Sequence, residues 1–191
     1  MVPMMMPAAM GIAEILQVAS AGPVRILDIA AGHGIFGIVL AQRNPQAEVV
    51  AQDWASVLEV ATEHARAMGV GDRHRTLPGS AFDVDYGTGY DVILVTNFLH
   101  HFNVETNVVL LRKVHGALVP GGRVVVLEFV PNEDRVSPPM AARFSLTMLS
   151  NTPEGDAYTF SELRRMLLDA GFRETTLHAL PGAHSVVLGV K

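Results

Sequence analysis

The amino-acid sequence predicts an α/β protein: a doubly wound, seven-stranded sheet with five parallel strands, an antiparallel C-terminal pair, and helices on both faces. Three observations predict it. Short runs of Val, Ile and Leu alternate with stretches of helical character, which is typical of a parallel sheet covered by helices. A glycine-rich segment follows the first run, and only residues 181–183 join the last two, too few for a parallel crossover.

The chain opens with an apolar, methionine-rich stretch. Ile12, Ile15, Leu16 and Ala19 fall at helical spacing, so we expect an N-terminal helix within residues 1–20. The stretch lacks the features of a secretory signal and is too short to span a bilayer. The strands predicted after it are Val24–Ile29, Glu48–Gln52, His74–Leu77, Asp91–Val95, Arg123–Glu128, Thr175–Ala179 and Ser185–Val190.

Helices are expected between the strands. Ser56 with Glu59, and Thr159 with Glu162, have the spacing of a capping box, in which a hydroxyl and a carboxylate satisfy the first backbone N–H groups of a helix. We therefore expect two helices to begin at these residues, the second ending near Gly171. The helices expected in the first part of the chain lie near Ile35–Gln42, Ser56–Met68 and Glu105–Leu118.

Length and composition bound the class of protein. A chain of 191 residues fits a single domain over residues 1–191, because domains usually hold about 100–200 residues. Its 49% hydrophobic and 17% charged residues are typical of a well-packed globular protein. A net charge of −5 without a Lys or Arg cluster argues against nucleic acid as a partner. Because there is no cysteine, thiolate chemistry is excluded, and we expect a cytoplasmic protein.

A glycine-rich loop is the first motif that carries chemistry. Residues 28–37 read DIAAGHGIFG, so Gly32, Gly34 and Gly37 form G-x-G-x-x-G between the first strand and a helix. Asp53 ends the second strand, 21 residues after Gly32. Glycines in such a loop let the backbone approach a nucleotide, and an acidic residue at that distance accepts the ribose hydroxyls. The pattern predicts a Rossmann-like cofactor site.

Charge selects among the cofactors that share this layout. A dinucleotide places its pyrophosphate against the loop and the helix N-terminus. Asp28 stands at the mouth of the loop, where a carboxylate would repel a pyrophosphate and attract the cationic groups of S-adenosylmethionine. The alternative is that Asp28 only caps loop amides. Ser80, Ala81 and Phe82 follow the third strand, where adenine is expected, and Phe82 either covers that ring or belongs to the core.

A second set of motifs follows the fourth strand. Residues 98–102 read FLHHF, a helix follows, and then Pro120-Gly121-Gly122 and a strand that ends in Glu128. In order and spacing these motifs resemble the class I S-adenosylmethionine-dependent methyltransferases, and more narrowly the catalytic domain of plant-type and bacterial small-molecule O-methyltransferases. In that family the fourth strand ends in a Leu-His-Asp-Trp-like segment, followed by a helix and a Pro-Gly-Gly turn. The resemblance runs from Pro3 to Lys191.

The resemblance implies methyl transfer from S-adenosylmethionine to a hydroxyl of a small aromatic acceptor. It implies that His100 is the general base and that Glu128 orients it, with His101 as the neighbouring candidate. A phenol with a pKa near about 10 becomes a better nucleophile as it loses its proton, and His titrates near about 6.5. The residues expected to bind the cofactor are Asp28, Ala30, Gly32, Gly34, Asp53, Trp54, Ser80, Ala81, Phe82 and Asn97.

The chain departs from the family pattern in several places. His100 is followed by His101 and Phe102 instead of Asp-Trp, so either imidazole could face the methyl group, and we prefer His100. Residues 155–159 read GDAYT where the family has a Gly-x-Glu-Arg-Thr-like segment. Ala157 therefore stands at the position of a second catalytic glutamate, with Asp156 or Glu154 as candidate substitutes. Ser80 replaces an adenine-contacting aspartate.

The family's N-terminal winged-helix dimerisation region would end where this chain begins. We therefore expect either a fragment or a stand-alone short form, with an apolar N-terminal surface that allows a homodimer. No metal is expected, because the histidines lack metal-ligand spacing and no carboxylate cluster is evident. The expected partner is a small-molecule acceptor, with neither nucleic acid nor a membrane.

Two other functions share part of the pattern. A non-catalytic domain that binds S-adenosylmethionine or S-adenosylhomocysteine would tolerate Ala157. A Rossmann-type NAD-dependent oxidoreductase would use the same glycines. The identity of the acceptor and of its reacting atom is open at the level of sequence.

Overall fold

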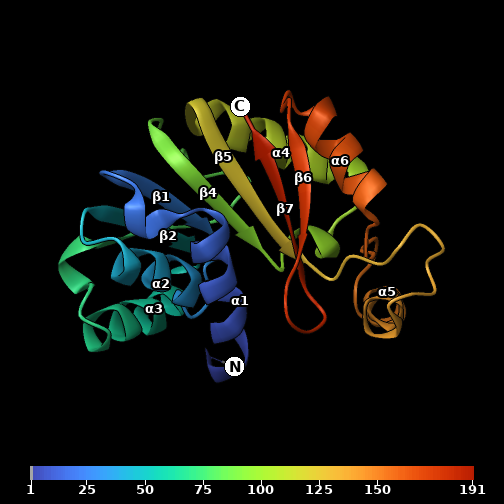
Figure 1. The fold of residues 1–191 in the computed structure, drawn as a ribbon, viewed down its shortest axis with the longest axis horizontal. Helices are drawn as coiled ribbons and strands as arrows, with labels where there is room; N and C mark the ends of the chain where they lie inside the picture. The colour runs from blue at the N-terminus through green and yellow to red at the C-terminus, as the bar shows by residue number, and fades with distance from the viewer. Residues whose placement is uncertain (1) are drawn as a thin grey trace. The chain divides into compact units, whose positions relative to one another are not determined.

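The computed structural model describes residues 2–191, with side chains from residue 4 onward, so Met1 of the predicted N-terminal helix lies outside the described residues. The strands are β1 (Val24–Ile29), β2 (Ala47–Asp53), β3 (His74–Pro78), β4 (Tyr90–Thr96), β5 (Leu118–Glu128), β6 (Thr175–Ala179) and β7 (Ser185–Val190). They form a seven-stranded sheet in the order β3-β2-β1-β4-β5-β7-β6 (Figure 1). The predicted α/β class and mixed sheet are confirmed. Within the described residues, no helix is long and apolar enough to cross a bilayer.

The chain divides into two compact units: a first unit that runs to Leu94 and includes Ala117–Gly122, and a second unit made of Val95–Gly116 and Arg123–Lys191. In the first unit, β1 pairs in parallel with β2, and β2 with β3. Two helices of this unit pack on its strands: α2 (Ile35–Arg43) contacts β1 and β2, and α3 (Ala55–Ala67) contacts β2 and β3. A third helix, α1 (Val2–Ile15), packs against α2; all three are drawn blue to green in Figure 1. The predicted N-terminal helix is thus present as α1, followed by the short turn η1 (Val18–Ser20).

Helix α3 does not begin as the sequence predicted. Its N-cap is Trp54, without a side-chain cap, and the predicted capping residue Ser56 lies inside the helix. The reason is local, because Asp53 Oδ1 accepts the Trp54 N–H at 2.7 Å and turns the chain into the helix two positions earlier. Once Ser56 is helical, its hydroxyl no longer occupies the extended N-cap position from which it could reach the first free N–H groups.

The second unit holds the antiparallel part of the sheet. The Arg123–Glu128 part of β5 pairs antiparallel with β7, and β7 with β6, so the predicted C-terminal hairpin is confirmed. The capping box at Thr159 and Glu162 is present and begins α6 (Phe160–Asp169). The other helices of this unit are α4 (Val104–Ala117), the short turn η3 (Leu99–His101) and α5 (Pro139–Asn151). The sequence patterns did not predict α5. The short turn η2 (Gly71–Arg73) belongs to the first unit.

The predicted Pro-Gly-Gly turn is part of a strand rather than a turn before one. Strand β5 begins at Leu118 and runs through these residues. Gly121 has φ 77°, a left-handed conformation that glycine adopts without a steric penalty and that lets the strand bend there.

Asp28 and Gly37 connect β1 to α2 inside the first unit. Asp28 is fully buried, and its Oδ2 accepts the Gly37 N–H at 3.0 Å. A Cβ added at Gly37 would lie 2.7 Å from Val49 Cγ1 and 3.2 Å from Asp28 Oδ2. Burial raises the pKa of Asp28 to about 7, the Gly37 hydrogen bond opposes the rise, and the nearby Asp53 adds to it. The close approach of helix and strand therefore depends on both residues.

Gly37→Ala is expected to lower the free energy of unfolding by about 1–3 kcal/mol, because the added methyl overfills the contact with Val49. Gly116→Ala is the matched control, since nothing lies within 4 Å of a Cβ at this position in α4 and alanine favours helix by about 0.5–1 kcal/mol. Urea unfolding measures both. Equal stability of the Gly37→Ala variant and the wild type would contradict the packing argument.

Asp28→Asn is expected to flatten the pH dependence of stability. The folded-state pKa of about 7 lies above the reference value of 3.8, so the proton on Asp28 stabilises the fold fully below the reference value, and this stabilisation is lost as the pH rises through about 7. The wild-type Tm should therefore fall more between about pH 5 and about pH 8 than that of the variant. Parallel Tm curves would show that Asp28 is ionised throughout this range.

Candidate functional site

The loop between β1 and α2 has a backbone conformation that few side chains adopt. Ala30, Gly32 and Gly34 have φ values of 51°, 56° and 76°, in the left-handed region that favours glycine. Gly34 donates its N–H to the Ala31 carbonyl at 2.8 Å and is the N-cap of α2. Because two of these positions lack a Cβ, the loop backbone can approach a ligand closely.

Asp53 joins this loop from the end of β2. Its Oδ2 accepts the Gly32 N–H at 2.9 Å and its Oδ1 the Trp54 N–H at 2.7 Å. The Asp53 side chain is half-buried, and Trp54 is 61% exposed. Each carboxylate oxygen has a second lone pair, so Asp53 can still accept hydroxyl donors such as those of a ribose.

Gln52 is a residue of this region that no motif marked. It is buried, its Oε1 accepts the Ala30 N–H at 3.4 Å, and its Nε2 donates to the Gly79 carbonyl at 2.6 Å. Gly79 in turn donates its N–H to the Asp53 carbonyl at 2.9 Å. Gln52 thus connects the loop after β1 with the loop after β3. The available signal was an amide side chain directly after the apolar run Val49-Val50-Ala51.

The loop after β3 holds the three residues predicted near an adenine. Ser80 Oγ accepts the Phe82 N–H at 3.2 Å, and the Ser80 carbonyl accepts from Asp83 and Val84. Ala81 is buried, while Phe82 is only half-buried. Phe82 is therefore not a core residue, and its ring has surface left for contact with a ligand.

The two carboxylates predicted at the cofactor site differ in exposure. Asp28 is 0% exposed, is bonded to Gly37, and its Oδ1 has no hydrogen-bond partner among the described residues. In this structure Asp28 binds the Gly37 N–H in the first turn of α2, a structural role close to the amide-capping alternative that the sequence left open. Asp53 is the carboxylate that a ligand can touch. A loop with the accessible Asp53 carboxylate beside it fits a positively charged nucleoside better than a pyrophosphate.

The second unit contains a buried histidine and carboxylate in contact. His100 Nδ1 lies 2.5 Å from Glu128 Oε2, and the two residues are 5% and 2% exposed. Glu128 Oε1 accepts the N–H groups of Phe98, Leu99 and His100 at 3.0, 2.9 and 3.4 Å. These donors compensate the buried carboxylate. With the Nδ1 proton directed at Glu128, the assigned tautomer leaves a lone pair on Nε2 of His100.

The neighbouring predicted residues have different surroundings. His101 is exposed, with its ring centroid 4.3 Å from that of His100. Partial burial and the adjacent His100 lower the pKa of His101, while Glu128 opposes this. Asn97 follows β4 with φ 53° and donates its N–H to the Leu127 carbonyl at 2.8 Å. Of the two adjacent histidines, His100 is the one bonded to a carboxylate.

Aromatic rings gather beside His100. Phe144 of α5 meets the His100 ring edge-on, with centroids 4.8 Å apart, and stacks on Phe129 at 4.1 Å. His184 packs against Phe129 with centroids 4.1 Å apart. Glu128 pairs with Ser185 in the antiparallel ladder, which brings the adjacent Phe129 and His184 opposite one another. No sequence motif marks these three residues.

The segment 155–159 supplies no second carboxylate to His100. Ala157 is buried at the position of the family's second glutamate. Asp156 Oδ2 pairs with Arg135 at 2.8 Å, and Glu154 Oε2 accepts from Asn103 at 2.6 Å. Within the described residues, both candidate substitutes are therefore bonded to other partners.

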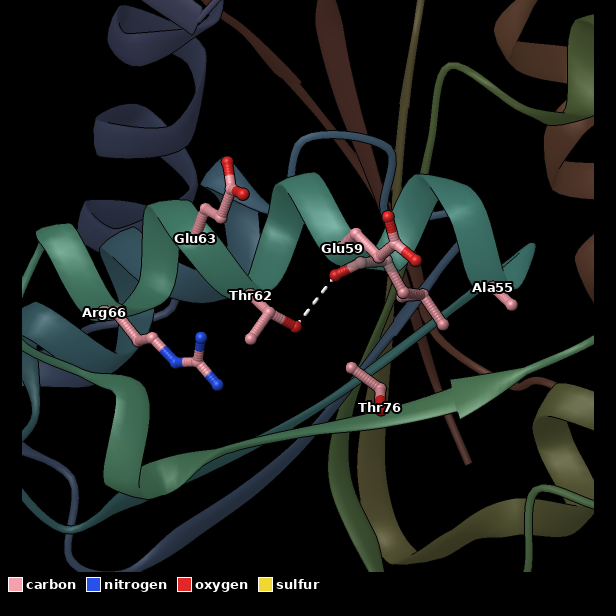
Figure 2. Close-up of a pocket in the computed structure, with 7 residues that line it drawn as sticks. Ala55, Glu59, Thr62, Glu63, Arg66 and Thr76 are labelled. Atoms are coloured by element: carbon pink, nitrogen blue, oxygen red, sulfur yellow. Dashed lines mark hydrogen bonds between the residues drawn. The ribbon is translucent and has the colours of Figure 1, made fainter.

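A separate pocket lies between α3 and β3. It has a volume of about 370 Å³ and is lined by Glu59, Glu63, Arg66 and neighbouring α3 residues, with Thr76 of β3 below the helix (Figure 2). None of the predicted site residues lines it. Across residues 2–191 no group of three or more His, Asp or Glu side chains is arranged to hold a metal ion.

Comparison with solved structures places the fold. A candidate O-methyltransferase from Nostoc punctiforme is 52% identical, superposes with a TM-score of 0.95, and is matched over 99% of this chain and 57% of its own length. PigF, an S-adenosyl-L-methionine-dependent methyl transferase of Serratia, was solved with SAH. It is 27% identical to this chain, with a TM-score of 0.79, and the match covers 87% of this chain and 50% of the PigF chain.

Comparison of sequences agrees. The chain is 34% identical over 169 residues to 3-hydroxy-5-methyl-1-naphthoate 3-O-methyltransferase from Streptomyces sahachiroi, which covers 87% of this chain and 49% of that protein. The chain thus spans about half the length of the curated relatives it matches. The profile of the O-methyltransferase domain matches residues 9–173. With a glycine loop and a buried His–Glu pair in place, the chain belongs to the O-methyltransferase domain family.

Proposed function

We propose that this chain transfers a methyl group from S-adenosylmethionine to a hydroxyl of a small aromatic acceptor, as one catalytic domain over residues 1–191. The buried His100–Glu128 pair, with its 2.5 Å contact, carries the proposal. A base needs one nitrogen fixed by a partner and the other free to accept a proton. Membership of the O-methyltransferase family supports the same reaction.

The methyl donor is assigned to the loop region of the first unit. When bound, S-adenosylmethionine supplies an electrophilic methyl group on a positively charged sulfur. Asp53 would accept hydrogen bonds from its ribose, Gly32 and Gly34 would allow the loop backbone to approach it, and Asp28 anchors the start of α2 through the Gly37 N–H. The similarity to PigF, solved with SAH, supports this cofactor. The other residues assigned to the donor are Ala30, Trp54, Ser80, Ala81, Phe82 and Asn97.

The proton of the acceptor hydroxyl is assigned to Nε2 of His100. As Nε2 takes the proton, Nδ1 stays bonded to Glu128, whose negative charge stabilises the imidazolium that forms. A phenol that keeps its proton, with a pKa near about 10, is a weak nucleophile at neutral pH, so removal of the proton in the transition state accelerates methyl transfer. His101 is the alternative base, and its exposed ring makes it the weaker assignment.

An aromatic acceptor fits the surroundings of the base. Phe144 lies 4.8 Å from His100 between ring centroids, and such rings favour contact with another planar ring. The Streptomyces sahachiroi relative is named for a hydroxynaphthoate, a bicyclic aromatic acid. We further propose that the chain acts as a homodimer, with the small acceptor as its other partner.

A second candidate function is binding of the donor or of S-adenosylhomocysteine without catalysis. Ala157 favours it, because this position carries no carboxylate and both nearby acids are bonded elsewhere. Under this proposal the chain would retain cofactor affinity and methylate no phenol.

His100→Ala is expected to lower kcat/KM for methylation of a phenol by about 10²–10⁴-fold, because the variant lacks the proton acceptor. Cofactor affinity should change little. His178→Ala is the control, since this histidine of β6 pairs with Thr176 in the hairpin. The readouts are methyl transfer from labelled S-adenosylmethionine and calorimetric titration of the cofactor. Undiminished turnover in His100→Ala would refute the base assignment.

Asp53→Ala is expected to weaken S-adenosylmethionine binding by about tenfold or more, because ribose hydroxyls lose a charged acceptor. Asp72→Ala, in η2 of the same unit, is the control. Calorimetric titration with S-adenosylmethionine and, separately, with NAD measures the change and tests the oxidoreductase alternative. Binding of NAD without binding of S-adenosylmethionine would overturn the proposed donor.

A further inference from the structure

His184 is a half-buried histidine whose ring nitrogen Nε2 is buried and has no part in the proposed chemistry. It lies immediately before β7, and its Nε2 is buried without a hydrogen-bond partner in the part of the chain that the structure describes. Buried side-chain nitrogens are nearly always paired with protein, water or ligand, because an unpaired one loses its hydration without compensation. The buried Nε2 of His184 is therefore available to form a hydrogen bond with a ligand group.

Backbone and ring contacts place His184 in a cluster of rings formed with Phe129, Phe144 and His100. The His184 carbonyl accepts the Leu180 N–H at 3.2 Å, which closes the hairpin between β6 and β7, drawn red in Figure 1. The His184 ring packs on Phe129 at 4.1 Å, and Phe129 stacks on Phe144 at the same distance. Phe144 in turn contacts the ring of His100 at 4.8 Å. A continuous series of rings thus connects the unpaired nitrogen to the base.

The charge of His184 limits what it can bind. Burial lowers the pKa of its imidazole, Glu128 opposes this, and His100 adds to it. The ring is therefore neutral at neutral pH, and its unpaired Nε2 suits an uncharged partner such as a hydroxyl rather than an anion.

We propose that His184 determines acceptor specificity: its Nε2 hydrogen-bonds a second, uncharged hydroxyl on the aromatic acceptor whose first hydroxyl meets His100. The inference rests on the proposed function and extends it to a substrate class, aromatic compounds with at least two hydroxyl groups. A site that hydrogen-bonds a substrate hydroxyl discriminates against an analogue that lacks it, because the protein group is then left unpaired.

The test compares phenol with catechol, resorcinol and hydroquinone in the full chain. Dissociation constants are measured calorimetrically in the presence of S-adenosylhomocysteine, and methyl transfer is measured separately. In the wild type, at least one dihydroxybenzene is expected to bind about tenfold more tightly than phenol. His184→Phe keeps a ring against Phe129 but has no nitrogen, so this preference should fall to about unity.

Two further variants keep the test decisive. His184→Gln retains a hydrogen-bonding group and is expected to preserve part of the preference, even if His184→Phe folds poorly. His178→Phe changes a histidine of the same hairpin whose Nε2 already pairs with Thr176 at 2.9 Å, and it should keep the wild-type preference. Near-ultraviolet circular dichroism establishes that each variant is folded.

The outcomes separate this inference from the proposed function. A preference for dihydroxybenzenes that survives in His184→Phe, or no such preference in the wild type, overturns the role of His184. A preference that disappears in His184→Phe while no phenol is methylated supports His184 as a ligand-binding residue and refutes the methyltransferase activity.

Discussion

A charged carboxylate buried at the end of a β-strand needs hydrogen-bond donors, because the desolvation free energy of an unpaired buried charge exceeds the stabilisation from any single contact. Glu128 meets the requirement with the backbone N–H groups of Phe98, Leu99 and His100. Asp28 accepts the Gly37 N–H with one oxygen, its other oxygen has no partner among the described residues, and burial raises its pKa to about 7. These amides lie in the first turn of α2, next to the loop assigned to the donor, and in the turn that holds the proposed base. The hydrogen bonds between these carboxylates and backbone amides therefore hold the chain segments that make up the candidate site.

In the His100–Glu128 pair, one carboxylate binds both the backbone of a turn and the side chain of a histidine in that turn. Glu128 uses one oxygen for backbone N–H groups and the other for the imidazole, so the orientation of His100 is set by the same carboxylate that organises its turn. The family's second glutamate position holds Ala157, and the acids beside it are paired elsewhere. Orientation of His100, the proposed base, consequently depends on Glu128, and the ring of Phe144 lies beside it.

Local patterns predicted the parts of the site that are contiguous in sequence. The glycine loop, Asp53 and the His100 turn each lie within a few residues of a strand end, where hydrophobic runs and glycines are visible in the chain. The Thr159 capping box was predicted and the Ser56 one was wrong, because Asp53 begins α3 earlier than the hydroxyl spacing implied. Gln52, Phe129 and His184 were missed because their partners are 15 to 55 residues away in the chain.

The sequence by itself determined the α/β class, the hairpin at the C-terminal end and the identity of the chemical groups, since these follow from hydrophobic period, short connections and motif spacing. The tertiary structure decided which groups meet. Because β7 lies between β5 and β6, His184 packs against Phe129. Asp28 is buried and binds the Gly37 N–H, whereas Asp53 stays accessible. Such outcomes depend on strand order and on the desolvation of each side chain, and neither is encoded in the spacing of residues along the chain.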